Sequence, residues 1–423
     1  MKFYIYSLGC KVNSYESNVM KDNLINNGFI YSDISDADIV IINSCTVTNS
    51  ADNKTMKLIR HVRNNYDVVL VVVGCFVQAK KDDLSVIPGD ILIGNKHKSI
   101  ISNYINRYLI DHKRIVDVSD ISNASFETMR LNNYDHTRAF IKVQDGCNNF
   151  CSFCIIPFTR GGVRSKSRDD IMEEAKSLIS NGHKEIVLTG IHTGNYGAEF
   201  DNYDFACLLS DMVKINGLER LRISSIEITE INDRVIDVIK NSNVLVDHMH
   251  IPLQSGSDTI LKLMNRKYDV NYFIDKINFL RSIRPDMNVT TDVIVGFPGE
   301  TDELFLETVS TIKNIGFSKL HVFPYSRRSG TVADKMDGQI LECVKKERVR
   351  VLLDLSHELE ISYMNKFKGM VVSFIPEVVK DEYLIGHTGN YLLIKCKGNE
   401  LVHDSVDVLI TDVDYPYCIG EFK

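Results

Sequence analysis

Each of the first three cysteines directly follows a short apolar segment that is expected to form a β-strand. Cys10 ends the sequence SLGC, Cys45 ends IINSC and Cys75 ends VVVGC. Helical stretches separate strand candidates at residues 2–7, 38–43, 68–73 and 90–93, and this alternation predicts a parallel α/β sheet. Because the carboxyl ends of parallel strands meet at one edge of a sheet, the three cysteines are expected to converge there. Three unrelated buried cysteines are the simpler alternative.

A second set of three cysteines has the spacing CxxxCxxC in the segment QDGCNNFCSFC. Cys147, Cys151 and Cys154 follow the first strand of a second α/β region, and no fourth cysteine follows nearby. Three closely spaced thiolates can hold three irons of a 4Fe-4S cluster and leave the fourth iron open to a small molecule. The alternative is zinc, which prefers a closed site of four ligands and finds no nearby histidine to complete one. The spacing therefore predicts an iron–sulfur site.

The chain divides into regions of different periodicity. The central region has six strand candidates separated by helices, which suits an open, partial (β/α)6 barrel rather than a closed eight-stranded barrel. After a long charged helix, the last segments are short, rich in valine, isoleucine and tyrosine, and broken by glycines, which predicts a small antiparallel β-barrel. The expected domains are a doubly wound parallel α/β domain at 1–112, a linker at 113–136, the partial barrel at 137–364 and the β-barrel at 365–423.

Composition excludes several classes of protein. The 423 residues include 49 basic and 56 acidic side chains, and 44% are hydrophobic, which excludes global disorder. The longest apolar run, VVLVVVGCFV, has about half of the roughly 20 residues that a membrane helix needs. No secretory leader is recognised, so a cytoplasmic protein is expected. The net charge of −7 disfavours a general nucleic-acid binder, although residues 138–168 carry a local excess of basic side chains.

The motifs around both cysteine sets resemble those of the radical S-adenosylmethionine (SAM) methylthiotransferases. The CxxxCxxC spacing after the first barrel strand is similar to the radical SAM superfamily, and the dispersed cysteines with a C-terminal β-domain resemble its methylthiotransferase branch. The similarity covers essentially the whole chain. Among its members, LGCKVN, GNKHK and GHTGNYLLIKC are most similar to the MtaB type, which modifies threonylcarbamoyladenosine in tRNA. The segments that carry the wider similarity are SLGCKVNSYES, QDGCNNFCSFCIIPFTRGGVRSKSR, HIPLQSGSDTILKLMNRKY and VIVGFPGET.

This resemblance implies two 4Fe-4S clusters and SAM as cofactors. A cluster on the CxxxCxxC cysteines would bind SAM and cleave it to a 5′-deoxyadenosyl radical, which would remove hydrogen from carbon 2 of the adenine. An auxiliary cluster on the three dispersed cysteines would carry the sulfur, which a second SAM methylates. The implied partners are the tRNA anticodon arm and a low-potential electron donor. The protein is expected to be a monomer and to bind no membrane.

Further candidate residues come from the barrel strand ends and from the C-terminal region, which resembles the RNA-binding TRAM module. Strand ends hold the functional groups of such barrels, and an N-cap is the alternative role for the serine and glutamate among them. The residues expected to bind SAM are Thr189, Gly190, Ser225, Glu227, Gly296 and Gly299. Arginines suit the carboxylate of a threonylcarbamoyl group, and aromatic and basic side chains suit single-stranded RNA. The residues expected to bind RNA are Arg164, Arg168, Tyr391, Lys395 and Lys397. Core positions are expected for His192, His248, His250 and His321.

Three functions are compatible with these motifs. The first is methylthiolation of threonylcarbamoyladenosine at tRNA position 37. The second keeps the chemistry but acts on isopentenyladenosine in tRNA or on a ribosomal protein side chain. The third is a non-catalytic iron–sulfur electron carrier or sensor, which two clusters with an open iron disfavour because a carrier gains nothing from an open site.

Overall fold

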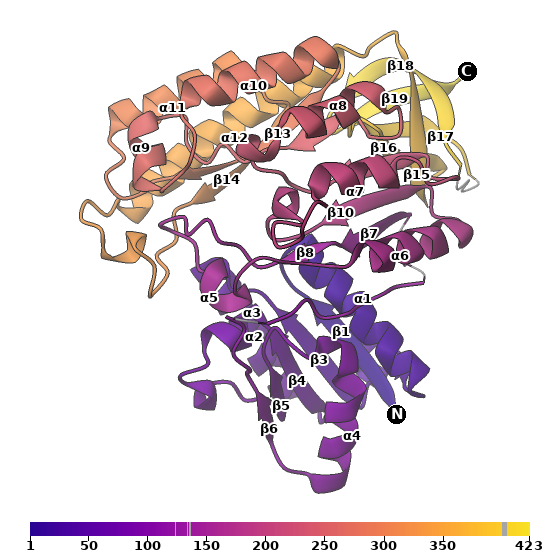
Figure 1. Cartoon of the computed structure of the whole chain (residues 1–423), viewed down its shortest axis with the longest axis vertical. Coiled ribbons are helices and arrows are strands. Elements are labelled where there is room, and N and C mark those ends of the chain that lie inside the picture. The colour runs from indigo at the N-terminus through magenta and orange to yellow at the C-terminus, as the bar shows by residue number, and fades with distance from the viewer. Residues whose placement is uncertain (123, 133, 135–136, 400–403) are drawn as a thin grey trace.

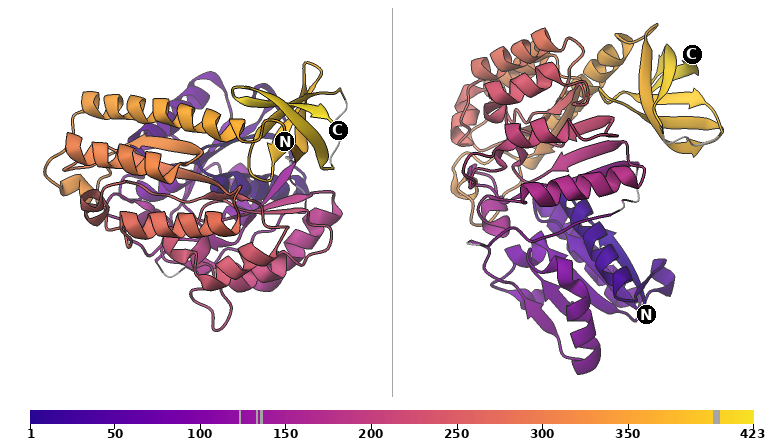
Figure 2. Two further views of the ribbon diagram at one scale, coloured as in Figure 1. Left: turned by 90° about the horizontal axis from the view of Figure 1, so that it is seen from above. Right: turned by 45° about the vertical axis from the view of Figure 1, so that its right-hand side comes forward.

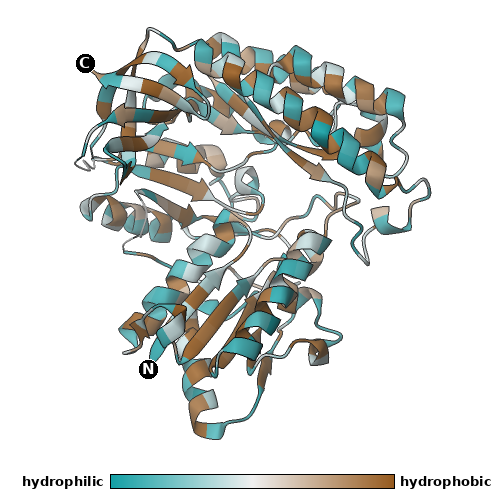
Figure 3. Cartoon of the chain, turned by 180° about the vertical axis from the view of Figure 1, so that it is seen from behind, coloured by the Kyte–Doolittle hydropathy of each residue, from teal (hydrophilic) through white to brown (hydrophobic). Residues whose placement is uncertain are grey.

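The N-terminal region is a parallel sheet with helices on both faces. In the computed structural model, which describes residues 1–122, 124–132, 134, 137–399 and 404–423, the strands have the order β2-β1-β3-β4-β5-β6 and all pair in parallel. The elements are β1 (Lys2–Ser7), α1 (Lys11–Asn26), β2 (Ile30–Tyr31), β3 (Ile39–Ser44), α2 (Asn49–Asn65), β4 (Val69–Gly74), α3 (Cys75–Ala79), β5 (Ile91–Ile93), α4 (Ile101–Asp111) and β6 (Ile115–Asp117). Inner strands such as β3 are buried throughout, as parallel strands covered on both faces must be. Figure 3 shows these hydrophobic strands enclosed by helices with hydrophilic outer faces.

The sequence pattern does not predict β2 and β6, which have two and three residues and are too short to show a period. β6 lies within the predicted linker at 113–136. Met129 and Leu131 of the same segment are buried in the hydrophobic core of the central region. The segment therefore packs as part of the fold over these residues, while residues 123, 133, 135 and 136 lie outside the described residues.

The central region is a partial barrel of six parallel strands, as predicted. Its two sheets, β11-β10-β7 and β12-β13-β14, are joined by a parallel bridge between Leu221 and Leu245. The strands are β7 (Arg138–Lys142), β10 (Glu185–Thr189), β11 (Arg220–Ile223), β12 (His248–His250), β13 (Asn288–Val295) and β14 (Lys319–Pro324). The helices are α5 (Ile156–Arg160), α6 (Arg168–Ser180), α7 (Phe205–Met212), α8 (Asp233–Asn241), α9 (Asp258–Leu263), α10 (Val270–Ile283), α11 (Asp302–Ile315) and α12 (Glu342–Asn365). A short hairpin of β8 (Gln144–Asp145) and β9 (Arg164–Ser165) follows β7. The helices cover the outer side of the strands in Figures 1 and 2.

The C-terminal region is a closed five-stranded barrel with the order β15-β16-β17-β19-β18. Its strands are β15 (Val371–Lys380), β16 (Tyr383–Thr388), β17 (Leu393–Lys397), β18 (Val406–Asp414) and β19 (Tyr417–Phe422). β17 and β19 pair in parallel and the other described pairs are antiparallel, so the prediction of an antiparallel barrel holds except at this closing pair. Arg220 fixes the barrel to the central region by donating to the His387 and Ser373 carbonyls at 2.9 and 3.0 Å.

Helix α1 joins the N-terminal sheet to the central barrel, and Figure 1 shows it at their junction. Its Met20 and Leu24 pack into the core of the sheet, whereas Tyr15 and Val19 pack into the core of the barrel. The Tyr15 hydroxyl donates to Glu174 Oε1 at 2.8 Å. The edge of the sheet where the cysteines lie is thereby held against the mouth of the barrel. Among the described residues, no helix combines the length and the apolar character needed to cross a membrane.

Candidate active site

The structure brings the three dispersed cysteines together at the carboxyl edge of the N-terminal sheet. The order β2-β1-β3 creates a topological switch between β1 and β3, the place where doubly wound sheets bind ligands. Cys10 follows β1, Cys45 follows β3, and Cys75 begins α3 directly after β4. A Cβ atom on Gly9 would lie 2.8 Å from Cys45 Sγ, and Gly9 has a positive φ of 98°. Glycine is therefore needed for the Cys10 loop to approach Cys45 this closely.

A buried network of charges surrounds Cys75. Arg160 Nε donates to Cys75 Sγ at 3.3 Å, and Asn95 Nδ2 lies at the same distance from this sulfur. Among the described residues, four buried basic side chains meet two buried carboxylates in this network. They are Lys98, Lys142, Arg160 and Arg164, with Glu16 and Asp145. Excess positive charge in a protein interior is costly unless an anion lies beside it. A cluster held by thiolates is such an anion, so the donor set fits an iron–sulfur cluster.

The other three cysteines lie on the loop between β8 and α5, at the mouth of the central barrel. Arg266 Nη1 donates to Cys151 Sγ at 3.4 Å, and His192 Nδ1 lies 3.6 Å from Cys147 Sγ. Cys154 makes a local turn in which its backbone N–H donates to the Cys151 carbonyl at 2.9 Å. Hydrogen-bond donors therefore face two of the three sulfurs, which suits sulfurs that carry negative charge.

Both cysteine sets contain a buried thiol that needs a bound cation to ionise. Burial raises the pKa of Cys45 to about 11 and that of Cys154 to about 12, so a bound cation is needed to keep either sulfur as a thiolate near neutral pH. Within the described part of the chain, no three His, Cys, Asp or Glu side chains are placed to hold one metal ion. Zinc would need every sulfur within about 2.3 Å of one point, whereas a cluster of several irons spaces its thiolates more widely. The choice of a 4Fe-4S cluster over zinc at these cysteines stays a prediction.

A cavity of 730 Å³ lies where the N-terminal sheet, the central barrel and the C-terminal barrel meet. Each of the three regions contributes to its wall. The lining includes Cys10 and Lys11 from the N-terminal region, Thr189, Gly190 and Ser225 from barrel strand ends, and Tyr391 from the C-terminal barrel. Ligand sites usually measure about 300–1,000 Å³, so the cavity has room for a nucleoside. Three of the six residues predicted to bind SAM thus face the same space as one of the dispersed cysteines.

Glu227 has the structural role that the sequence leaves open for it. It caps the short helix Ile228–Glu230 through reciprocal hydrogen bonds with Glu230. Its carboxylate also forms an ion pair with Arg266, the arginine that faces Cys151. Glu227 is not among the cavity-lining residues, so its place is behind the cysteine loop rather than against the open cavity.

Gly296 and Gly299 form the tight turn after β13, with positive φ values of 70° and 84°. The Gly296 N–H donates to Glu300 Oε2 at 2.6 Å. A Cβ atom on Gly296 would come within 2.4 Å of Lys345 Cγ, so a larger residue does not fit. The turn requires glycine for its own packing, and SAM binding by these two residues stays a prediction.

The two arginines predicted to bind a substrate carboxylate are occupied within the protein. Arg164 is 7% exposed, and its Nη2 lies 3.0 Å from Asp145 Oδ2 in the buried network. Arg168 begins α6 on the outer surface, where its Nε lies 2.8 Å from Asp211 Oδ2. Neither arginine lines the cavity. Because both guanidinium groups already have carboxylate partners, a role for them in binding the substrate is not proposed.

Tyr391 lies at the junction of the two barrels rather than on an open RNA-binding face. Its ring stacks on His248 with centroids 4.7 Å apart, and its hydroxyl accepts from Arg138 Nη1 at 2.8 Å. Lys395 and Lys397 lie on β17, and Lys395 Nζ lies 4.4 Å from the centroid of the Tyr383 ring. The lysines stay candidates for contacts with RNA, whereas Tyr391 belongs to the cavity wall.

Two further cavity residues, Lys11 and His248, are not among the sites predicted from the sequence. Lys11 directly follows Cys10 in the sequence. A residue next to a cysteine at the end of a strand is expected to lie in the same crevice as that cysteine, so the position of Lys11 in the cavity could have been predicted from the sequence. His248 is buried at 8% exposure, as predicted for a core histidine, but its buried Nδ1 is left without a hydrogen-bond partner among the described residues.

Proteins with similar sequences cover nearly the whole chain. Residues 141–312 match the radical SAM superfamily, and residues 2–94 match uncharacterized protein family UPF0004. The chain is 44% identical to the threonylcarbamoyladenosine tRNA methylthiotransferase MtaB of Bacillus subtilis (strain 168), over 99% of this chain and 95% of that protein. The protein of the same name from Thermotoga maritima is 38% identical over 90% of both chains. The chain belongs to the MtaB-type radical SAM methylthiotransferases.

More distant proteins resemble this methylthiotransferase over most of its length. The tRNA-2-methylthio-N(6)-dimethylallyladenosine synthase of Clostridium perfringens (strain SM101 / Type A) is 33% identical over 99% of this chain and 97% of that protein. Among solved structures, the radical SAM methyltransferase TsrM from Kitasatospora setae has a TM-score of 0.58 at 13% identity, covering 79% of this chain and 76% of that chain. At such low identity, the likeness shows a shared fold alone.

Proposed function

We propose that this methylthiotransferase adds a methylthio group to carbon 2 of the adenine of threonylcarbamoyladenosine at position 37 of tRNA. The observation that carries the proposal is that Cys10 of the dispersed set and the strand-end residues Thr189 and Ser225 line one cavity. A base splayed out of an RNA loop can enter a cavity of this size. The similar proteins from B. subtilis and T. maritima are named threonylcarbamoyladenosine tRNA methylthiotransferases.

The cofactors of a radical SAM protein are a 4Fe-4S cluster and SAM, and we assign this cluster to the CxxxCxxC cysteines. A second 4Fe-4S cluster on Cys10, Cys45 and Cys75 is part of the proposal, supported by the excess of buried positive charge beside Cys75. When bound, these groups supply the one-electron chemistry that an aromatic C–H bond requires and the sulfur that replaces its hydrogen.

The protein's own residues orient the sulfurs. Arg266, which faces Cys151, is held from behind by Glu227. His192, which faces Cys147, is held in the same way by Glu230. On the N-terminal side, Arg160 faces Cys75 and is held by Glu16, with Nη1 2.9 Å from Oε1. Groups fixed behind metal ligands keep those ligands in place and tune their charge, so each of these pairs has a positioning role.

The character of the cavity favours a polar group on N6 of the adenine. Lys11, His248, His250 and Asp292 all line it. Burying an apolar isopentenyl group against these side chains would remove them from water without replacing their hydrogen bonds. A ureido group with a carboxylate can replace them. An electron carrier has no need for such a cavity, and the similar proteins are named as tRNA enzymes rather than as ribosomal-protein enzymes.

The C-terminal barrel is the proposed binding site for the anticodon arm. It lies beside the cavity and contributes Tyr391 to its wall. Lys395 and Lys397 on the same barrel can contact phosphates of a single-stranded loop. The low-potential electron donor and the monomeric state stay predictions.

Mass spectrometry of bulk tRNA nucleosides tests the proposal directly. Cells without the gene should lose 2-methylthio-threonylcarbamoyladenosine and accumulate threonylcarbamoyladenosine, and the wild-type gene should restore the product. A gene that encodes Cys147→Ala is the matched control and should restore nothing. Loss of the 2-methylthio-isopentenyl nucleoside instead would refute the substrate, and no change in either nucleoside would refute the activity.

A further inference from the structure

The wall of the cavity contains a lysine that has no partner. Lys11 is the first residue of α1 and lines the cavity beside Cys10. In the described part of the chain, its ammonium group forms no ion pair and no hydrogen bond. Two other lysines at the same domain junction, Lys98 and Lys142, each bind a carboxylate and are buried. Lys11 is exposed to the cavity instead, so its charge is available to a ligand.

Three carboxylates at this junction of the domains already have basic side chains as partners. Glu185 accepts from Arg222 Nε at 2.7 Å, and Asp292 Oδ1 lies 3.2 Å from His250 Nε2. Glu377 lies 2.8 Å from His387 Nδ1 and 3.4 Å from Arg138 Nη2. Asp292 acts on the Lys11 ammonium through space, but no anion among the described residues forms an ion pair with it.

The surroundings of Tyr391 are also positively charged. Its ring centroid lies 4.7 Å from the Arg222 guanidinium and 4.7 Å from the ring of His248. Burial would raise the pKa of Tyr391, but Arg138, Lys11 and Arg222 together hold it below its ordinary value. An anion that enters here therefore meets a favourable field.

His248 adds a ring nitrogen without a hydrogen-bond partner to this corner. It lines the cavity, and its Nε2 lies 3.3 Å from the Thr290 hydroxyl while Nδ1 has no partner. When Nε2 accepts from Thr290, Nδ1 carries the ring proton and can donate it to an acceptor. A buried donor without a partner costs free energy, which an incoming acceptor would recover.

We infer that Lys11, assisted by His248, binds the carboxylate of the threonylcarbamoyl group and so selects an acidic substituent on N6 of the adenine. The inference rests on the function proposed above and adds the residues that recognise the N6 substituent of the substrate. C6 and N1 alone separate N6 from carbon 2 in the ring, so a group on N6 can reach residues that border Cys10. Lys11 is a specificity residue in this scheme, because it touches the substituent rather than the carbon that reacts.

The test compares variants of the protein on two substrates that differ in one group. Two synthetic anticodon stem-loops carry threonylcarbamoyladenosine, one with its carboxylate and one with a carboxamide in its place. Wild-type enzyme should prefer the carboxylate about 10- to 150-fold in kcat/KM, the size expected of a hydrogen bond to a charged group. Lys11→Met should lower kcat/KM for the carboxylate by a similar factor and bring the preference close to one. Lys11→Arg keeps the charge and should keep most of the preference.

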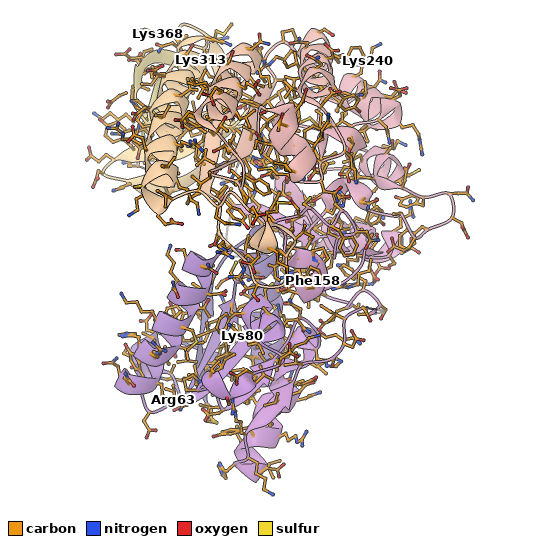
Figure 4. All side chains as sticks on the ribbon, turned by 90° about the vertical axis from the view of Figure 1, so that its left-hand side faces the viewer. Arg63, Lys80, Phe158, Lys240, Lys313 and Lys368 are labelled. Atoms are coloured by element: carbon orange, nitrogen blue, oxygen red, sulfur yellow. The ribbon has the colours of Figure 1, made fainter. Side chains whose placement is uncertain are left out.

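Two controls make the outcome decisive. Lys313→Met removes an exposed lysine of α11, which Figure 4 shows far from the N-terminal domain, and should leave the preference at the wild-type value. Iron content measured for each variant separates a lost cluster from a lost contact. Equal losses on both substrates, or a preference that survives Lys11→Met, would overturn the role of Lys11. A wild-type enzyme that modifies neither stem-loop but modifies an isopentenyl one would overturn the proposed function itself.

Discussion

Replacing Glu16 with glutamine should weaken the junction between the N-terminal domain and the radical SAM core. Glu16 lies on α1 and is 1% exposed. It binds Lys98 of its own domain together with Lys142 and Arg160 of the core, the latter two at 2.7 and 2.9 Å. Burial alone would raise the pKa of Glu16, but Arg160, Lys142 and Lys98 hold it well below its ordinary value. The carboxylate is therefore charged in the folded protein and is the shared anion of both domains.

The magnitude follows from what glutamine leaves behind. The side chain keeps its shape, but the four buried cations of the network then face one carboxylate, Asp145. Removing one partner from a buried ion pair costs about 3–5 kcal/mol, because the remaining charge stays buried without compensation. An exposed pair is the matched control. Lys2 and Asp36 lie 3.2 Å apart with side chains 47% and 60% exposed, so Asp36→Asn should cost about 0–1 kcal/mol.

Anaerobic urea unfolding followed by circular dichroism measures both variants. The Glu16→Gln protein should unfold at clearly lower urea, and its first transition should report separation of the N-terminal domain. Hydrogen exchange should rise in α1 and β7 before it rises in the C-terminal barrel. A Glu16→Gln protein as stable as Asp36→Asn would refute the reasoning, because it would show that the network does not need this anion.

Three further predictions use other parts of the molecule. Cys75→Ala should abolish the methylthio product, while 5′-deoxyadenosine still forms; mass spectrometry measures both products. The iron content of the variant should be about half that of the wild type. A normal amount of methylthio product would show that the N-terminal domain does not deliver the sulfur. Gly296→Ala should destabilise the protein more than Gly316→Ala in thermal unfolding. Both glycines have positive φ, which costs about 1–2 kcal/mol for alanine. A Cβ atom at position 296 would also lie 2.4 Å from Lys345 Cγ, which adds about 1–3 kcal/mol, whereas one at position 316 would meet nothing within 4 Å. Equal losses would contradict the packing. Burial would raise the pKa of Glu377, but a hydrogen bond with His387 and the charges of Arg138 and Arg222 hold that pKa below its ordinary value. Docking of the C-terminal barrel should therefore be complete above about pH 5 and weaken as the pH falls below about 4, and hydrogen exchange in β15 that does not change with pH would contradict this.

The convergence of the dispersed cysteines is the part of the site that sequence predicts best. Parallel strands put their carboxyl ends at one edge, so a cysteine after each strand has few other places to lie. The switch point itself is not visible in the sequence, because it depends on β2, a strand of two residues. Because β2 lies on one side of β1 and β3 on the other, the connections leave β1 in opposite directions, and the crevice lies between β1 and β3.

The charges of the site are the part that sequence predicts worst. The local excess of basic residues at 138–168 does not indicate whether these side chains are exposed, and the structure buries Lys142, Arg160, Arg164 and Lys166. Their partners include Glu16, which is more than 120 residues earlier in the chain. Pairing over such a distance leaves no periodic signal, so a count of local charge cannot separate a solvated patch from an internal network.

Helix α1 couples recognition of the substrate to the position of the dispersed cysteines in this fold. Cys10 precedes its first turn, and Lys11 begins that turn at the cavity. Asn13 and Glu16, three residues apart on one face, both bind Arg160, which faces Cys75. Tyr15 fixes the same helix to the radical SAM core. Because a helix is rigid over these two turns, a ligand that pulls on Lys11 acts on an element that also sets the position of Cys10 and of Arg160. The carboxylate of the substrate would then help to hold the dispersed cysteines against the core, and a substrate without it would meet a sulfur site that is less firmly placed.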